Sequence, residues 1–366
     1  MWQKGNAVVK LRCVLCRRWA PTAPSHEGPR RRHVPLAVLA LLLASSGARA
    51  TSGTIVPGGI WRDTAGHIIE AHGAGLLFVN GWYYWFGEDH AGAGTDASFR
   101  NIRCYRSRTL RRWTFVRNVL TRRARGELGP GRVVERPKVL FNLRTRRFVL
   151  YVHIDDLEYR EAKVGVATSR HVCGPYTYHG SRRPLGHESR DLTLFRDADG
   201  AGYLISEDRR ASGLRIYRLT ANYRHVQAAV ALPQPNHEAP ALVKQDGRYV
   251  LVGSQLTGWA PNANAYATAP TLAGPWSPFR PLAPCSSNTF ASQIAFLLPI
   301  MGPQARFVLY LGDRWIGSAL GESRYVWLPL DHRGSGHAEL VRCLDTRRPS
   351  GDVDTRGARC RPCTPG

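Results

Sequence analysis

The sequence repeats one hairpin pattern five times, and this repeat limits the possible folds more than any other feature. Each copy begins with a polar residue, continues as a short apolar strand, turns, and ends in a second apolar strand. The polar residues that open the copies, at spacings of 63, 56, 47 and 55 residues, are His72, Glu135, Asp191, Glu238 and Gln293. Repeats of this length with several strands each are typical of β-propellers. We therefore predict an all-β, five-bladed β-propeller.

The turns between the paired strands support this prediction. Asn80-Gly81 and Asp246-Gly247 each separate two apolar runs. Such dipeptides favour the type I′ turn, because both of its central residues need positive φ.

Propeller geometry also predicts a functional site. The first strand of every blade lines the central channel, so the five opening residues should meet at one mouth of that channel. Carboxylates that converge raise one another's pKa, which favours a functional site over a structural one. The alternative is that they are ordinary solvated polar residues at strand starts. We therefore expect the active site at one mouth.

The first 50 residues have the composition of a targeting segment. Arg30-Arg31-Arg32 precedes the apolar run Val34–Ala44, which is followed by Ala48-Arg49-Ala50. This pattern predicts a secretory signal peptide cleaved after Ala50, and hence an extracellular protein, with a Golgi signal anchor as the alternative. The run is too short to span a bilayer, so no membrane span is expected in the mature chain. The predicted domains are therefore the prefix 1–50, the propeller 51–331, and a tail 332–366 that is partly flexible or pinned by a disulfide.

Charge and cysteine content limit the possible partners. The net charge is +24, but the arginines are scattered and no nucleic-acid-binding motif accompanies them. We expect no specific nucleic-acid partner, only attraction of polyanions at low salt. Six cysteines follow the prefix, and their pairing stays open: Cys104, Cys173, Cys285, Cys343, Cys360 and Cys363.

Short motifs in a fixed order carry a family resemblance over about residues 55–330. They are Ala71–Gly75, Tyr83–Glu88, Glu135–Val139, Ser189–Asp191, Glu238–Pro240, Thr257–Asn262, Ser292-Gln293, Gly312–Trp315 and Tyr325–Pro329. The ordered set resembles glycoside hydrolase family 43, and more narrowly its exo-β-1,3-galactanase subfamily. The resemblance implies a secreted, inverting exo-glycosidase that removes terminal β-1,3-linked galactose from galactan and the side chains of arabinogalactan. It also implies a monomer without a cofactor.

The resemblance assigns roles to the opening residues. Glu238 would be the general acid, with its pKa raised by burial and by neighbouring carboxylates. Asp191 would tune that acid and bind a sugar hydroxyl, although an ion pair with Arg190 is an alternative. The family's usual base, an aspartate in the first repeat, is absent at Ala71-His72-Gly73. The residue in the position of the base would therefore be Gln293, as the resemblance to the subfamily implies, or Glu135.

Further residues are candidates for binding the sugar. Tyr159 and Trp259 could stack on its apolar face, as could Trp315, and Thr257 and Asn262 could bind its hydroxyls. Glu88 and Glu207 are weaker candidates, because they end second strands, which we expect to lie away from the mouth. No metal site is predicted, because neither the histidines nor Asp197–Gly200 has ligand spacing.

Two other functions remain possible. The missing base carboxylate is compatible with a propeller lectin that binds galactan without cleaving it. An arabinosidase or xylosidase of the same family is disfavoured by the absent first-repeat aspartate.

Overall fold

The computed structural model describes residues 55–284, 287–301, 306–333 and 337–340. The chain divides into two units, Met1–Arg49 and Ala50–Gly366. The predicted signal peptide and most of the predicted tail therefore lie outside the described residues.

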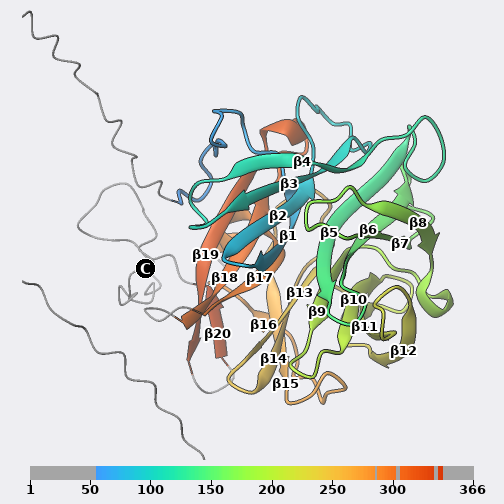
Figure 1. Cartoon of the computed structure of the whole chain (residues 1–366). Coiled ribbons are helices and arrows are strands. Elements are labelled where there is room, and N and C mark those ends of the chain that lie inside the picture. Colours follow the sequence, from blue (N-terminus) through green and yellow to red (C-terminus); the bar gives the residue numbers. More distant parts are fainter. Residues whose placement is uncertain (1–54, 285–286, 302–305, 334–336, 341–366) are drawn as a thin grey trace, which may run out of the picture. The chain divides into compact units, whose positions relative to one another are not determined.

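The described part of the second unit forms five four-stranded antiparallel sheets, which confirms the five-bladed β-propeller (Figure 1). In each sheet the strands follow the order of the chain, with the first strand toward the middle of the ring. Blades 1 and 2 are built from β1 (His72–Val79), β2 (Trp82–Glu88), β3 (Asn101–Ser107), β4 (Thr114–Thr121), β5 (Arg132–Asn142), β6 (Arg147–Asp156), β7 (Lys163–Ser169) and β8 (Thr177–Arg182).

The other three blades follow the same plan. Blades 3 and 4 are built from β9 (Leu192–Arg196), β10 (Gly202–Asp208), β11 (Gly213–Leu219), β12 (Val226–Ala231), β13 (Glu238–Gln245), β14 (Arg248–Ser254), β15 (Ala265–Ala269) and β16 (Arg280–Pro281). Blade 5 is built from β17 (Gln293–Met301), β18 (Arg306–Arg314), β19 (Arg324–Arg333) and β20 (His337–Leu340). Three one-turn helical segments lie between strands: Pro184–Gly186, α1 (Asn288–Ala291) and Leu320–Glu322.

Some strand boundaries differ by a few residues from the positions of the opening residues and of the predicted tail. Strand β5 begins at Arg132, so Glu135 lies inside its strand, whereas Asp191 lies just before β9. Strand β20 pairs with β19, so the fifth sheet extends beyond residue 331 to Leu340.

The hydrophobic core is divided into clusters between neighbouring blades. The cluster between blades 5 and 1 closes the ring, and it is the most aromatic: Trp61 packs against Trp85, Tyr325 and Trp327. The hydroxyl of Tyr325 also accepts the N–H of Ala71 at 2.8 Å. Because every strand of blade 5 comes from the C-terminal part of the chain, side-chain packing rather than a shared sheet joins the two blades.

A β-bulge follows the opening residue in three blades. The next residues, Gly73, Arg136 and Ala239, have φ of 58°, 54° and 50°, and the register of each strand shifts directly after them. Bulges re-aim the side chains beside them and commonly lie next to active sites. The opening side chains are thereby turned out of the regular alternation of the strand.

Hydrogen bonds between neighbouring blades fix the positions at which these first strands begin. In four blades the N–H after the opening residue donates to a side-chain oxygen of the preceding blade. We call these the inter-blade amide bonds. They join Gly73 to Asp313 (2.9 Å), Arg136 to Glu88 (2.8 Å), Ala239 to Asp191 (3.1 Å) and Ile294 to Asn264 (2.8 Å).

One disulfide joins blades 1 and 2. It links Cys104 in β3 to Cys173 in the loop after β7. The other four cysteines lie outside the described residues, so their pairing stays open.

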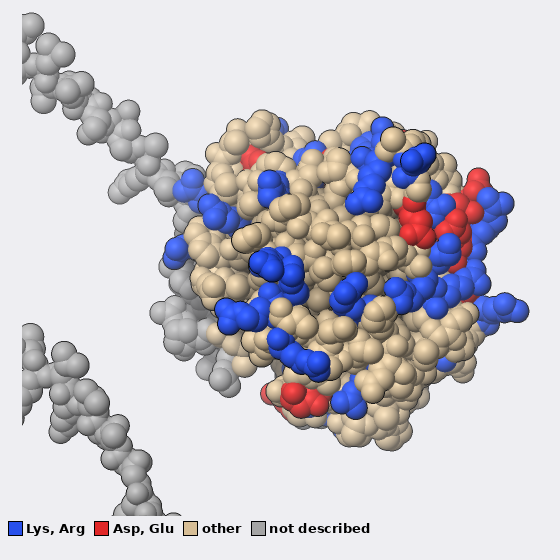
Figure 2. All heavy atoms as spheres, turned by 45° about the vertical axis from the view of Figure 1, so that its right-hand side comes forward, with Lys and Arg blue, Asp and Glu red and all other residues tan. Residues whose placement is uncertain are grey.

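The surface reflects the excess of arginine. Figure 2 shows a face on which Lys and Arg side chains far outnumber Asp and Glu. Within the described ranges, no helix combines the length and the apolar character needed to cross a bilayer.

Gly73→Ala should destabilise the propeller, because a methyl group there would lie 1.9 Å from Oε1 of Glu88 and the φ of 58° disfavours any side chain. The expected loss is about 1–3 kcal/mol in the free energy of unfolding, seen as a lower denaturant midpoint. Gly94→Ala is the matched control, because a methyl group there meets no heavy atom within 4 Å. An unchanged midpoint for Gly73→Ala would mean that the bulge of blade 1 is not needed.

Candidate active site

The strand starts surround a pit of about 230 Å³ at one mouth of the channel. Its lining comes from blades 2, 3, 4 and 5: Arg136, Tyr159, Asp191, Arg209, Glu238, Leu256, Gly258, Trp259 and Gln293. Three of the five opening residues, Asp191, Glu238 and Gln293, therefore line the pit, and two do not. Glu135 lies behind Tyr159 rather than on the pit wall, and His72 is buried beside Trp315, with their ring centroids 5.2 Å apart.

Glu238, the first residue of β13, has the electrostatic properties of a proton donor. Burial, followed by the charges of Asp191 and Glu207, raises the pKa of its carboxyl group to about 8. The charges of Arg136 and then Arg209 act in the opposite direction, and Nη2 of Arg209 lies 3.4 Å from Oε2 of Glu238. The carboxyl group is therefore protonated at neutral pH and open to the pit, as a general acid requires.

Gln293 is fixed by hydrogen bonds at every position of its amide. Its Nε2 donates to Oε1 of Glu238 at 2.9 Å and to Oγ of Ser254 at 3.0 Å. Its Oε1 accepts from Nη2 of Arg136 at 2.6 Å and from Nε1 of Trp315 at 2.9 Å. The orientation of the amide is thereby determined, and it holds one oxygen of Glu238 directly.

An unusual turn delivers Gln293 to the pit. All four residues of α1 have φ between 48° and 56°, the left-handed conformation that side chains disfavour. The turn is held from outside, because the N–H of Asn264 donates to Oγ1 of Thr289 at 2.7 Å and Arg314 donates to a carbonyl of α1, also at 2.7 Å. Such strain persists only where surrounding contacts fix it, and it is common at functional sites.

Arg136 is the central cation of the pit, and it was not among the predicted site residues. It is buried, and its Nη2 lies 2.8 Å from Oδ2 of Asp191. Asp191 is therefore paired with Arg136 of blade 2, and the expected alternative pairing with Arg190 is wrong. Arg136 directly follows the opening residue Glu135. This place in the repeat was the feature of the sequence that could have predicted a position near the mouth.

Glu135 is enclosed by two polar side chains, those of Tyr159 and His153. Tyr159 donates to its Oε1 at 2.8 Å, and Nδ1 of His153 lies 3.4 Å from its Oε2. Burial, together with the charge of Glu88, raises the pKa of Glu135, while His153 opposes this rise. Burial alone would lower the pKa of His153, but the hydrogen bond to Asp155 and the nearby carboxylate of Glu135 raise it to about 9. The imidazole is therefore a cation at neutral pH.

The expectation that Glu88 and Glu207 lie away from the mouth was wrong. Both end the second strand of a hairpin, and antiparallel pairing returns that end to the opening residue: Glu88 pairs with His72 in register. Burial would raise the pKa of Glu88, but its bond to His90 lowers it to about 2. Glu207 accepts from Arg209 at 2.7 Å, and burial with the charge of Asp191 raises its pKa to about 7.

Thr257 and Asn262 do not line the pit. Asn262 is buried, and it holds the loop after β14 by donating to the carbonyl of Gln255 and to Oγ1 of Thr257. Trp259, on the same loop, does reach the pit wall, where its ring lies 4.8 Å from that of Trp315. The two polar residues therefore shape the loop that presents the tryptophan.

A metal could in principle be held by Glu135, His153 and Asp191, whose ligand atoms all lie within 4.8 Å of one another. Their partners favour another interpretation. Asp191 is paired with Arg136, and His153 is protonated and hydrogen-bonded to Asp155, so it offers no lone pair. These residues form an ion-pair network, for which no metal is needed to balance charge.

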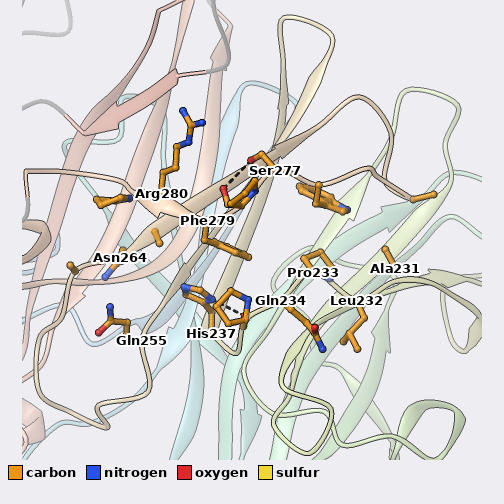
Figure 3. Close-up of a pocket in the computed structure, with 17 residues that line it drawn as sticks. Ala231, Leu232, Pro233, Gln234, His237, Gln255, Asn264, Ser277, Phe279 and Arg280 are labelled. Atoms are coloured by element: carbon orange, nitrogen blue, oxygen red, sulfur yellow. Dashed lines mark hydrogen bonds between the residues drawn. The ribbon is translucent and has the colours of Figure 1, made fainter.

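A larger cavity, of about 880 Å³, lies between blades 3 and 4 (Figure 3). It is lined by apolar, proline and amide side chains, with Ser277, Arg280 and His237, which stacks on Phe279, and no carboxylate is among its lining residues. Glu238 lines the pit although His237, its neighbour in sequence, lines this cavity. Because no carboxylate lies beside His237 in its lining, this cavity is not a candidate for the acid–base chemistry of the pit.

The pit thus combines a protonated carboxyl group, several carboxylates, a buried guanidinium and a tryptophan wall. Planar polar groups can fix hydroxyl groups, and the aromatic face can cover the apolar side of a sugar ring. The site is suited to acid-assisted cleavage of a bond to a polyhydroxylated substrate.

Comparisons with known proteins agree with this chemistry. The model of the family described as glycosyl hydrolases family 43 matches residues 75–292. No curated protein sequence matches the chain.

Three solved structures are similar over most of the described chain. An exo-β-1,3-galactanase from Phanerochaete chrysosporium with galactose is 43% identical, with a TM-score of 0.75, and the match covers 79% of this chain and 67% of that one. An exo-β-1,3-galactanase from Clostridium thermocellum is 37% identical, with a TM-score of 0.74 and coverage of 79% and 65%. A putative exo-β-1,3-galactanase from Bifidobacterium bifidum is 34% identical, with a TM-score of 0.74 and coverage of 82% and 98%.

Proposed function

The chain belongs to glycosyl hydrolase family 43 and is a glycoside hydrolase, and we propose that it releases galactose from the non-reducing end of β-1,3-galactan. The observation that carries this proposal is the protonated carboxyl group of Glu238 in a pit built from four blades. The galactan specificity follows from the similarity to the three galactanases.

Glu238 is the proposed general acid. It protonates the glycosidic oxygen as the bond to the leaving sugar breaks, a step that typically contributes a factor of about 10²–10⁴ to the rate. Asp191 keeps the pKa of this acid high, because its charge disfavours ionisation of Glu238. Asp191 itself is held by Arg136 and by the N–H of Ala239.

The group that accepts the proton of the attacking water is either Gln293 or Glu135. An inverting site needs roughly 6.5–9.5 Å between acid and base to admit that water. Gln293 lies within hydrogen-bond distance of Glu238, and its oxygen already accepts from Arg136 and Trp315. These contacts favour Gln293 as the residue that positions the acid, and they leave as the base Glu135, whose Oε1 is linked to the pit by the hydroxyl of Tyr159.

The dimensions of the pit support action at a chain end. A volume of about 230 Å³ lies below the range of roughly 300–1,000 Å³ that is typical for drug-sized ligands. Arg136 is buried at its base, and below it Nζ of Lys138 donates to the carbonyl of Gly73 at 2.8 Å. A pit of this size is suited to one terminal sugar unit.

The cellular location and assembly are part of the same proposal. The basic and apolar pattern in residues 1–50 supports secretion with cleavage after Ala50, and the mature enzyme is proposed to act as a monomer.

The first prediction concerns the stereochemistry of release. Proton NMR of β-1,3-galactotriose digestion should show α-galactose first, because a single displacement inverts the β-bond. Glu238→Gln should lower kcat by about 10²–10⁴, because the amide cannot donate the proton. Binding of the trisaccharide with no galactose released by the unaltered enzyme would instead identify a lectin, and β-galactose appearing first would contradict inversion.

A second prediction concerns the alkaline limit of activity. The enzyme should lose kcat/KM as the pH rises through about 8, because Glu238 must be protonated. Glu207→Gln removes a like charge and should move this limit to lower pH, whereas Arg209→Met removes a cation and should move it to higher pH. Glu158→Gln, at an exposed carboxylate outside the pit, is the control and should leave the limit in place. Shifts of the same sign in both pit variants would refute this electrostatic account.

A third prediction identifies the base. Glu135→Ala should lose activity and regain part of it with added azide, because azide attacks without a base and yields α-galactosyl azide. Gln293→Ala should not be rescued by azide, because its loss misplaces the acid. Rescue of Gln293→Ala alone would assign the proton acceptor to the amide.

A further inference from the structure

A second pocket, of about 420 Å³, lies between blades 2 and 3. We propose that it binds a carboxylate-bearing sugar unit, such as a uronic acid residue, of an acidic polysaccharide. Its lining consists of donors and hydroxyl groups with one valine: Thr145, Arg147, Val149, Thr168, Thr177, His179, Asn222 and Arg224. No carboxylate is among these residues.

The pocket lies on the face of the propeller opposite to the pit. The first strands begin at the pit, so the turn between the first and second strands of a blade lies at the other face. Arg147 begins β6, Thr177 begins β8, and Arg224 lies in the turn between β11 and β12. Antiparallel order places all three at that far face, so this site is separate from the catalytic one.

The cations of the pocket are not neutralised. Neither Arg147 nor the guanidinium of Arg224 forms a hydrogen bond or ion pair with any residue in the described ranges, and Nε of Arg224 is buried without a partner. A buried guanidinium nitrogen without an acceptor is costly, and a bound anion would satisfy it. One such nitrogen in Arg224, beside the unpaired guanidinium of Arg147 in the same cavity, therefore points to an anionic ligand.

The pKa values of two neighbouring histidines reflect the positive charge of these arginines. Burial, with the charge of Arg224, lowers the pKa of His179. Burial, with the charges of Arg182 and Arg224, likewise lowers the pKa of His225. Nη1 of Arg182 donates to Nδ1 of His225 at 2.6 Å, so this ring is neutral and adds no acidic partner.

The remaining groups favour a sugar acid over a simple ion. The hydroxyl of Thr177 and the amide nitrogen of Asn222 make no hydrogen bond to a described residue, and they can bind sugar hydroxyls. Arginine binds carboxylates in a bidentate manner. A cavity that is walled by threonines and reaches about 420 Å³ also exceeds the space that a single inorganic ion needs. A flat lipid or nucleic-acid surface would not use such a recess.

Such a site would attach the enzyme to its polysaccharide. An acidic unit held at the far face would keep the enzyme on a charged polysaccharide while the pit acts on neutral chain ends. This inference does not rest on the proposed galactanase activity, because ligand binding is measured without turnover.

The test measures binding of D-glucuronate by calorimetry at 0.15 M salt, with D-glucose and inorganic sulfate as comparison probes. Glucuronate should bind, glucose should not, and sulfate should bind more weakly. Arg147→Gln combined with Arg224→Gln should weaken glucuronate binding by about tenfold or more, because two charge-assisted contacts are lost. In the unaltered protein, bound glucuronate should raise the pKa of His179, followed by NMR.

The matched control is Arg112→Gln combined with Arg144→Gln, which removes the same charge from exposed arginines outside the pocket. It should leave glucuronate binding within about twofold. Equal losses in both double variants would reduce the effect to diffuse attraction and overturn the proposal. Sulfate binding as tightly as glucuronate would overturn the assignment to a sugar. Hydrolysis of β-1,3-galactotriose should be unchanged in both variants, so failure of the catalytic proposal would appear separately.

Discussion

The inter-blade amide bonds are the contacts on which both the ring and its catalytic pit depend. A backbone N–H in blades 1, 2, 4 and 5 donates to a side-chain oxygen from the preceding blade. Because the donor follows the opening residue directly, the same bond that joins two blades also fixes where that residue's side chain points. Three of the acceptors are carboxylates at the mouth, Asp313, Glu88 and Asp191, so the groups that assemble the ring also set the electrostatic field of the pit.

That field is balanced by buried cations rather than by solvent. Ionised carboxylates are costly to bury unless they are paired and hydrogen-bonded. Arg136 and His153 meet this need on the side of blade 2, where they pair with Asp191, Glu135 and Asp155. Glu238 receives less compensation, since its nearest arginine lies 3.4 Å away and is partly exposed. Unequal pairing is therefore what separates one protonated acid from its charged neighbours, a common way of assigning acid and base roles.

The sequence predicted the strands and blades better than it predicted which side chains contact one another. Turn dipeptides and alternating apolar residues identified the hairpins, and their repetition identified the blades and the residues that open them. Glu88 and Glu207 were misplaced because antiparallel pairing brings the end of a second strand back beside the start of the first. Thr257 and Asn262 have residue types that suit sugar binding, but they bond to each other within their own loop. Arg209 offered no local pattern, since its importance comes from contacts with Glu207 and Glu238 on different strands.

Local patterns in the sequence were sufficient to predict the five hairpins, the five-bladed ring and the residues that open its blades. These follow from period-two apolar patterns and turn residues, which act over a few positions and are therefore visible in one sequence. The state of each channel residue was decided only by tertiary structure. Whether Glu238 is protonated, whether Asp191 pairs with Arg136, and whether Gln293 is free to act all depend on groups about 50 to 150 residues away in sequence. Burial and charge act through space, so only the closed ring determines them.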